Sequence, residues 1–167
     1  MMDNIMQTKN TKKDLMHWRT NVDEDSIAWL RLQTDGKSVN VLTHAVMAEL
    51  ESLIDQLESS ESLNGVGLLS GKPGGFIYGA DINEFETLKT AEDVADHMRY
   101  VHSLFNRIEA LPVPTCVGVE GIAVGGGLEI ALVFDRLFVT SSPKTKLGFP
   151  EVNLSLIHIS EPTRLAI

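Results

Sequence analysis

Several features are scarce in this sequence, and each scarcity excludes a class of protein. Only one of the 167 residues is cysteine, which excludes an intrachain disulfide and a cysteine-rich metal site. Positive charge is also scarce, because 14 Lys and Arg stand against 23 Asp and Glu, and this argues against a nucleic-acid binder. No apolar run approaches the ~18–20 residues that span a bilayer. Residues 1–14 lack the apolar core of a signal peptide, so a soluble cytoplasmic protein is expected.

What the sequence does contain is enough apolar material for one folded domain. Hydrophobic residues make up 43% of the chain and charged residues 22%, which excludes a disordered acidic tail. Residues 1–15 are polar and without periodicity, and a flexible leader is expected there. The rest has no internal repeat or linker, so we predict a single domain.

Two helices are predicted from apolar residues at helical spacing. Thr43 caps the first helix, whose apolar stripe consists of Val46, Leu50, Leu53, Ile54 and Leu57. Thr90, followed by Asp93, begins the second in the manner of a capping box. Its stripe consists of Val94, Met98, Val101, Phe105 and Ile108.

Short β-branched and apolar runs alternate with these helices. A hairpin is predicted within residues 16–33, and a short helix within 128–134. Further strands are predicted at residues 63–70, 115–119, 135–140 and 146–149. This alternation predicts an α/β fold with helices packed on a sheet.

Two glycine-rich loops are the most informative segments. The first glycine loop, residues 71–85, reads GKPGGFIYGADINEF, and the second glycine loop, residues 118–127, leads into a helix. Neither has the spacing of a Walker A or dinucleotide-binding loop, and no G-x-S-x-G motif is present. Glycines that enter a helix direct backbone N–H groups at one point, which suits an oxyanion. The alternative is that Gly125, Gly126 and Gly127 only allow tight packing of helix on strand.

Three motifs bear on the choice between ligand binding and tight packing, because they resemble motifs of a known family. Gly79-Ala80-Asp81-Ile82, Gly125-Gly126-Gly127-Leu128-Glu129 and Gly148-Phe149-Pro150-Glu151 resemble the three signatures of the enoyl-CoA hydratase/isomerase (crotonase) family. The resemblance covers residues 16–157, and it is strongest to the N-terminal hydratase domain of the multifunctional fatty-acid oxidation enzymes (alpha subunit). It implies a superhelix of ββα repeats that is incomplete at the C-terminus. Residues 158–167 depart from the family pattern and are expected to be a tail that arose by truncation.

The resemblance also implies a reaction, the hydration of trans-2-enoyl-CoA in fatty-acid β-oxidation. The backbone N–H groups of Ala80 and Gly126 would bind the thioester oxygen. Glu129 would orient and activate the water, and Glu151 would deliver the proton to C2. Two alternatives remain open, an enoyl-CoA isomerase and an inactive fragment that at most binds acyl-CoA.

Further contacts with the CoA thioester are implied for Gly79, Asp81, Ile82, Gly125 and Gly127. Lys37 is a candidate for binding the anionic CoA, whereas Lys72 is expected to be an ordinary exposed lysine. No metal and no cofactor is expected in this chain, because NAD would serve only the dehydrogenase part of the multifunctional enzymes. The expected partners are the acyl-CoA substrate, further copies of the chain and a thiolase subunit. The family's C-terminal helices are missing here, so exposed apolar faces and poor solubility are expected.

Overall fold

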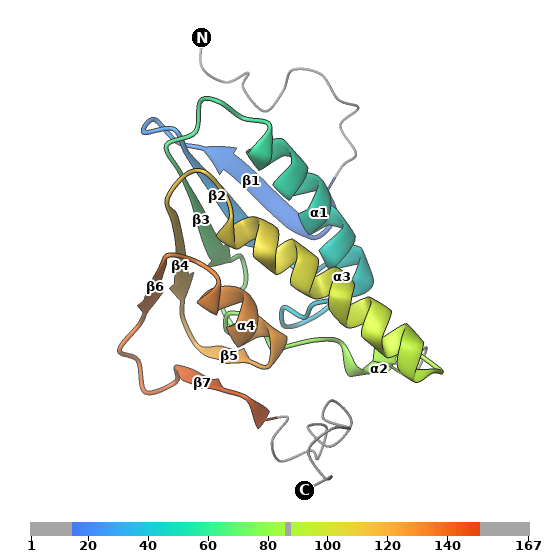
Figure 1. The fold of residues 1–167 in the computed structure, drawn as a ribbon. Coiled ribbons are helices and arrows are strands. Elements are labelled where there is room, and N and C mark those ends of the chain that lie inside the picture. Colours follow the sequence, from blue (N-terminus) through green and yellow to red (C-terminus); the bar gives the residue numbers. More distant parts are fainter. Residues whose placement is uncertain (1–14, 86–87, 151–167) are drawn as a thin grey trace, which may run out of the picture.

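A computed structural model describes residues 15–85 and 88–150, and a five-stranded sheet forms its frame (Figure 1). The strands lie in the order β1-β2-β3-β4-β6. Their bounds are β1 (Trp18–Val22), β2 (Ile27–Leu32), β3 (Gly65–Ser70), β4 (Thr115–Val119) and β6 (Arg136–Val139). β1 and β2 form the predicted antiparallel hairpin, and the other neighbours are parallel. The α/β prediction is confirmed.

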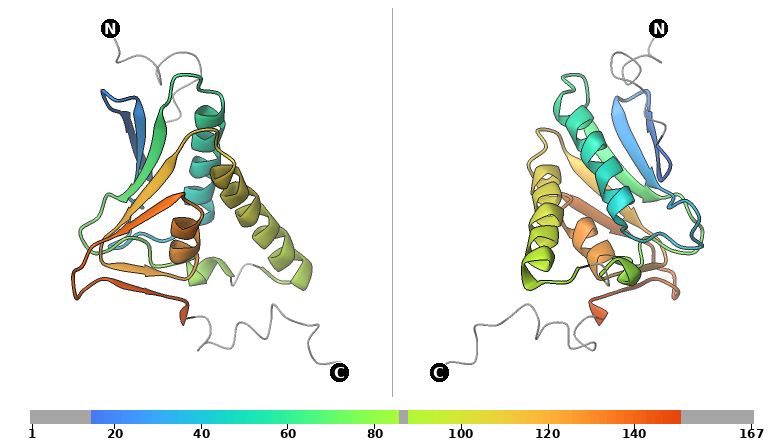
Figure 2. Two further views of the ribbon diagram at one scale, coloured as in Figure 1. Left: turned by 60° about the vertical axis from the view of Figure 1, so that its left-hand side comes forward. Right: turned by 90° about the vertical axis from the view of Figure 1, so that its right-hand side faces the viewer.

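Two long helices, α1 (His44–Glu58) and α3 (Ala91–Glu109), cover one face of this sheet (Figure 2). The apolar stripe predicted for α1 is buried throughout. In α3 Leu104, Phe105 and Ile108 are fully buried, whereas the first three residues of the predicted stripe are less so. Val94, Met98 and Val101 are half-buried because the N-terminal half of α3 projects beyond the sheet.

Local capping fixes where both helices begin. Thr43 accepts a hydrogen bond from the N–H of Val46 at 3.1 Å. Thr90 accepts from the N–H of Asp93, whose carboxylate accepts from the N–H of Thr90 in return. Each cap satisfies N–H groups that have no partner inside the helix, and both predictions of the helix starts are confirmed.

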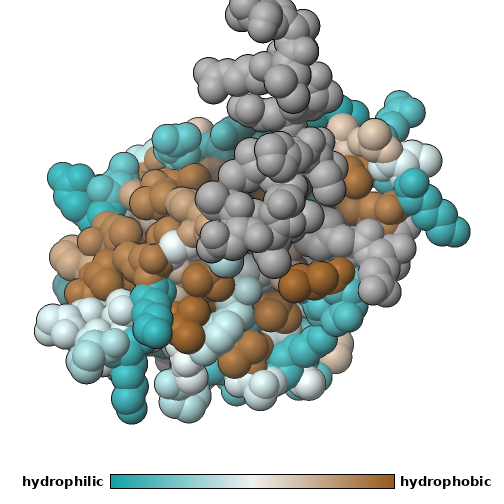
Figure 3. Space-filling model, turned by 90° about the horizontal axis from the view of Figure 1, so that it is seen from below, coloured by the Kyte–Doolittle hydropathy of each residue, from teal (hydrophilic) through white to brown (hydrophobic). Residues whose placement is uncertain are grey.

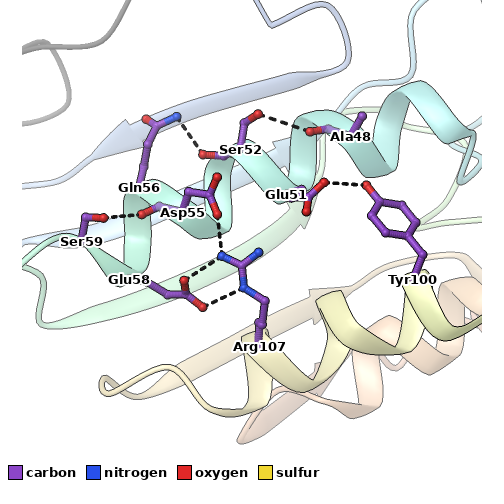
Figure 4. Close-up of polar contacts among 9 residues, drawn as sticks. All are labelled: Ala48, Glu51, Ser52, Asp55, Gln56, Glu58, Ser59, Tyr100 and Arg107. Carbon is purple, nitrogen blue, oxygen red and sulfur yellow. Dashed lines mark hydrogen bonds and ion pairs between the residues drawn. The ribbon is translucent and has the colours of Figure 1, made fainter.

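Charged side chains join the exposed sides of α1 and α3 (Figure 4). The guanidinium of Arg107 bonds the carboxylates of Asp55 and Glu58 at 2.6 and 2.7 Å. Seven residues earlier in α3, the hydroxyl of Tyr100 donates to the carboxylate of Glu51 at 2.9 Å. Partial burial and this carboxylate raise the pKa of Tyr100 to about 12.

A second, smaller layer lies beneath the main sheet and contains two elements that the sequence pattern did not predict. β5 (Ile122–Val124) pairs in parallel with β7 (Lys146–Gly148). The two helices of this layer are α2 (Ile82–Phe85) and α4 (Gly126–Leu132). β5 and α2 were missed because each has only three or four residues inside a glycine loop. This layer carries the candidate site.

Hydrophobic side chains gather on the side of the molecule seen from below (Figure 3). Large hydrophobic side chains with exposed fractions of 42% or more include Ile82, Leu132, Phe138, Val139, Leu147 and Phe149. The expectation of exposed apolar faces is therefore confirmed for the described residues. None of the helices within residues 15–85 and 88–150 has the length and apolar character needed to cross a membrane.

Candidate active site

The two glycine loops meet because residues 76–80 run between two other extended segments. On one side Leu42 pairs with Ala80, and on the other Ile77 pairs with Ala123 of β5, both in parallel. The N–H of Tyr78 donates to the carbonyl of Asn40, and the N–H of Val124 donates to the carbonyl of Ile77. Three segments that are distant in sequence therefore lie side by side at this place.

This pairing decides where the N–H of Ala80 points. Leu42 donates to the carbonyl of Gly79 at 2.8 Å, and Asp81 donates to the carbonyl of Leu42 at 3.1 Å. Because successive N–H groups of extended backbone point to opposite sides, the N–H of Ala80 points away from Leu42. Across residues 15–85 and 88–150 it meets no hydrogen-bond acceptor. Within the described residues it is available to a ligand.

Gly126 lies close to Ala80. A Cβ placed on Gly126 would be 4.0 Å from the nitrogen of Ala80, and one on Gly79 would be 3.9 Å from the nitrogen of Gly126. Gly126 is the first residue of α4, so its N–H has no acceptor inside the helix. The two N–H groups named by the resemblance are thus brought together.

The second glycine loop reaches this position through backbone conformations that only glycine adopts easily. Gly125 has φ 53° and ψ -134°, and its N–H donates to the carbonyl of Gly148. Gly127 packs so tightly on the first loop that a Cβ would lie 2.3 Å from the carbonyl oxygen of Ile77. Tight packing, the alternative interpretation of these glycines, is therefore correct for Gly127. It does not exclude a role for the N–H of Gly126 in binding a ligand.

Glu129 stands one turn into α4 with its carboxylate beside Gly126. Its Oε2 is 3.6 Å from the place that a Cβ on Gly126 would occupy. The N–H of Glu129 donates to the carbonyl of Gly125 at 3.0 Å, which fixes the residue in the first turn. The site therefore combines two backbone donors with one carboxylate. Glu151, the second predicted glutamate, lies outside the described residues.

Lys37 and Asp81 form an ion pair next to Ala80. Their Nζ and Oδ2 atoms are 2.9 Å apart, with 45% of the lysine side chain and 11% of the aspartate side chain exposed. Asp81 also accepts from the backbone N–H of Asn83 at 3.1 Å. These hydrogen bonds hold the pKa of Asp81 below its usual value, and the bond from Lys37 has the largest effect. Ile82, the next predicted contact, is 72% exposed beside this pair.

A cavity of about 310 Å³ opens beside Ala80. It has the size of the smaller ligand pockets of proteins. Its lining consists of Leu42, His44, Ala80, Asp81, Glu84, Leu88 and His97. Among the residues that the structure describes, no group of three His, Cys, Asp or Glu side chains is arranged to hold a metal ion.

The sequence analysis missed a polar network that supports the first glycine loop. Asn40, only 1% exposed, accepts from the N–H of Thr34 and donates to the carbonyls of Leu32 and Phe76 and to the hydroxyl of Ser70. A buried asparagine must find such partners, because an unpaired amide is costly. An asparagine inside the apolar run Val39 to Leu42 was the available signal.

Lys72 also differs from its prediction as an ordinary exposed lysine. It is half-buried, and its ammonium donates to the carbonyl of Thr34 at 2.6 Å and to that of Lys37. The prediction was wrong because both acceptors belong to a loop more than 30 residues earlier in the chain.

Comparison with known proteins connects this geometry to a family. A sequence model of the family described as enoyl-CoA hydratase/isomerase matches residues 23–160. The fatty acid oxidation complex subunit alpha of Idiomarina loihiensis is 40% identical over 136 residues, which cover 81% of this chain and 19% of that protein. The subunit of the same name from Shewanella halifaxensis is 34% identical over 80% of this chain and 19% of that protein. The chain thus spans about a fifth of the length of these curated relatives.

Solved structures show the same fold. An enoyl-CoA hydratase from Bacillus anthracis has a TM-score of 0.74 at 24% identity, with 83% of this chain and 52% of that chain covered. A protein titled as a putative enoyl-CoA hydratase from Streptomyces coelicolor has a TM-score of 0.74 at 19% identity, with 96% and 64% covered. The chain accounts for about half to two-thirds of these folds, so the crotonase fold predicted as incomplete is confirmed as such.

Proposed function

Because the chain belongs to the enoyl-CoA hydratase/isomerase family, we propose that its two glycine loops bind the thioester carbonyl of an enoyl-CoA for hydration. Water would add across the 2,3 double bond of the trans-2-enoyl group. The hydroxyl would go to C3 and a proton to C2, which yields a 3-hydroxyacyl-CoA. The curated relatives named above are subunits of fatty acid oxidation complexes, which supports β-oxidation as the setting.

The observation that carries this proposal is the convergence of the two N–H groups. During addition of water, negative charge develops on the thioester oxygen as an enolate. The backbone nitrogens of Ala80 and Gly126 lie close together, and no acceptor within residues 15–85 and 88–150 bonds either N–H group. Removing one such donor from an oxyanion site costs roughly 10²–10³ in rate.

Glu129 would orient and activate the water, because its carboxylate lies beside these donors. In this proposal Glu151 supplies the proton at C2. Two carboxylates that share a water need not divide their roles cleanly, since their titrations are coupled. An isomerase needs one base and no water, so a hydratase requires both glutamates, whereas an isomerase would need only Glu151.

The remaining proposed contacts serve the rest of the substrate. Gly79, Gly125 and Gly127 shape the loops, and Asp81 and Ile82 lie at the mouth of the site beside Lys37. Lys37 supplies local positive charge for the polyanionic CoA in a chain with net charge -9. The reaction uses no metal or redox cofactor. Assembly with further copies and with a thiolase subunit is part of the same proposal.

Replacement of Glu129 by Gln tests the proposal directly. We expect Glu129→Gln to abolish hydration of crotonoyl-CoA, followed by loss of its ultraviolet absorbance, because the amide cannot accept the proton of the water. Isomerisation of a 3-enoyl-CoA should fall much less. Glu109→Gln, at an exposed glutamate that ends α3, is the matched control and should leave both rates unchanged.

Three outcomes would contradict parts of this proposal. Equal loss of both activities in folded Glu129→Gln would count against the division of labour between the glutamates. Isomerisation without hydration in the unmodified chain would favour the isomerase. Calorimetric binding of CoA without turnover of either substrate would favour a fragment that only binds acyl-CoA.

A further inference from the structure

The ammonium of Lys72 bonds the backbone of residues 34–37 rather than projecting into solvent. Its Nζ donates to the carbonyl of Thr34 at 2.6 Å and also to the carbonyl of Lys37. The backbone of Lys72 is itself fixed, because its N–H donates to the hydroxyl of Ser70 at the end of β3. Hydrogen bonds from a charged donor are stronger than neutral ones. Lys72 thus ties the segment 34–37 to the main sheet.

The two ends of that segment differ in how firmly they are otherwise held. Thr34 is 1% exposed, and its N–H donates to the side chain of Asn40 at 2.9 Å. Lys37 is exposed and follows Gly36, whose φ is 67°. The Lys72 ammonium spans both ends, so it joins the exposed end to the buried one.

The exposed end matters because it carries a side chain of the candidate site. The ammonium of Lys37 lies 2.9 Å from Asp81, the residue after Ala80. A loosened segment would let Lys37 leave Asp81, and the mouth of the site would then lose its positive charge. Lys72 reaches neither Ala80 nor Asp81 through any hydrogen bond found in the described part of the chain. Its effect would therefore pass through Lys37.

We propose that Lys72 is a positioning residue that keeps Lys37 at the mouth of the thioester site by binding the carbonyls of Thr34 and Lys37. The proposal rests on the proposed function, because it assumes that Lys37 attracts the CoA ester. Lys72→Met keeps the aliphatic stem and removes the ammonium. Its KM for crotonoyl-CoA should rise about tenfold while kcat changes less than twofold. Lys72→Arg, which retains a charged donor, should recover most of the loss.

A double-mutant cycle separates positioning from a general structural role. In the Lys37→Met background, adding Lys72→Met should raise KM no further, because Lys37 has already been removed. Lys144→Met, at an exposed lysine between β6 and β7, is the matched control and should leave KM unchanged in both backgrounds. An equal rise in KM with and without Lys37 would overturn the proposal.

Hydrogen exchange provides a readout that does not depend on activity. Lys72→Met should speed exchange of the amides of residues 35–39 and leave those of β3 unchanged. Unchanged exchange at residues 35–39 would overturn the proposal. Should Lys72→Met not fold, Lys72→Gln is measured by the same criteria. Should the unmodified chain not turn over crotonoyl-CoA, the proposed function fails, while the exchange rates still decide the role of Lys72.

Discussion

The two glycine loops bring the backbone nitrogens of Ala80 and Gly126 close together, but they are held there by opposite means. Around Ala80 the first loop is supported by side chains, namely the Asn40 amide, the Ser70 hydroxyl and the Lys72 ammonium. Around Gly126 the second loop is supported by the absence of side chains, since it packs on Ile77 at a distance that excludes a Cβ. The first loop should therefore fail when atoms are removed, and the second when atoms are added.

The largest effect is expected at Gly127, where the second loop has no room. Gly127→Ala would place a Cβ 2.3 Å from the carbonyl oxygen of Ile77, and both backbones are buried. We expect the free energy of unfolding to fall by about 3 kcal/mol, measured by urea denaturation. Gly74→Ala in the first loop meets nothing closer than 4.0 Å and should be near neutral. Similar losses in the two variants would remove the contrast between the loops.

Gly126 should respond in rate rather than in stability. The nearest atom to a Cβ there would be the flexible Cδ1 of Leu42 at 3.3 Å, so Gly126→Ala should fold. The methyl group would occupy the space between the nitrogen of Ala80 and the carboxylate of Glu129. We expect hydration of crotonoyl-CoA to fall about 10²-fold, as for loss of an oxyanion donor. A normal rate in the folded variant would show that the thioester oxygen binds elsewhere.

The first loop should be sensitive to removal of the side chains that support it. Asn40→Ala leaves the N–H of Thr34 and the carbonyls of Leu32 and Phe76 without their side-chain partner. Buried groups that lose a partner cost free energy, so we expect a loss of about 2 kcal/mol in urea denaturation. Asn106→Ala, exposed on α3, is the control and should change little. An unchanged midpoint for Asn40→Ala would mean that backbone pairing alone holds Ala80.

The smallest effect is expected at the Lys37–Asp81 pair, and it should depend on pH. The pKa of Asp81 is lowered in the folded chain, so its contribution to stability is complete above the unfolded value of about 4. This contribution is lost as the pH falls through the lowered folded pKa. The stability difference between the unmodified chain and Asp81→Asn should therefore be constant at neutral pH and shrink below about pH 4. A difference that persists at pH 2 would exclude the carboxylate charge as its source.

Much of the fold was predictable because its signals are local. Thr43 and Thr90 bond N–H groups three residues away, so both helix starts could be located from the sequence. The convergence of Ala80 and Gly126 followed only from the family motifs. Lys72 and the bonds of Asn40 to Ser70 and Phe76 escaped prediction because these partners lie 30 or more residues away. The pairing of Glu129 with Glu151 stays a prediction, since Glu151 is outside the described residues.

The topology of the site has a consequence for how the chain acquires it. The bonds that join its segments span 36 residues from Asn40 to Phe76, 38 from Thr34 to Lys72 and 44 from Lys37 to Asp81. Each closes a long stretch of chain, whose entropy is lost before the contact is gained. Folds dominated by such distant contacts fold slowly, in milliseconds to seconds. The closeness of Ala80 and Gly126 therefore belongs to the folded domain and not to either glycine loop as an isolated peptide.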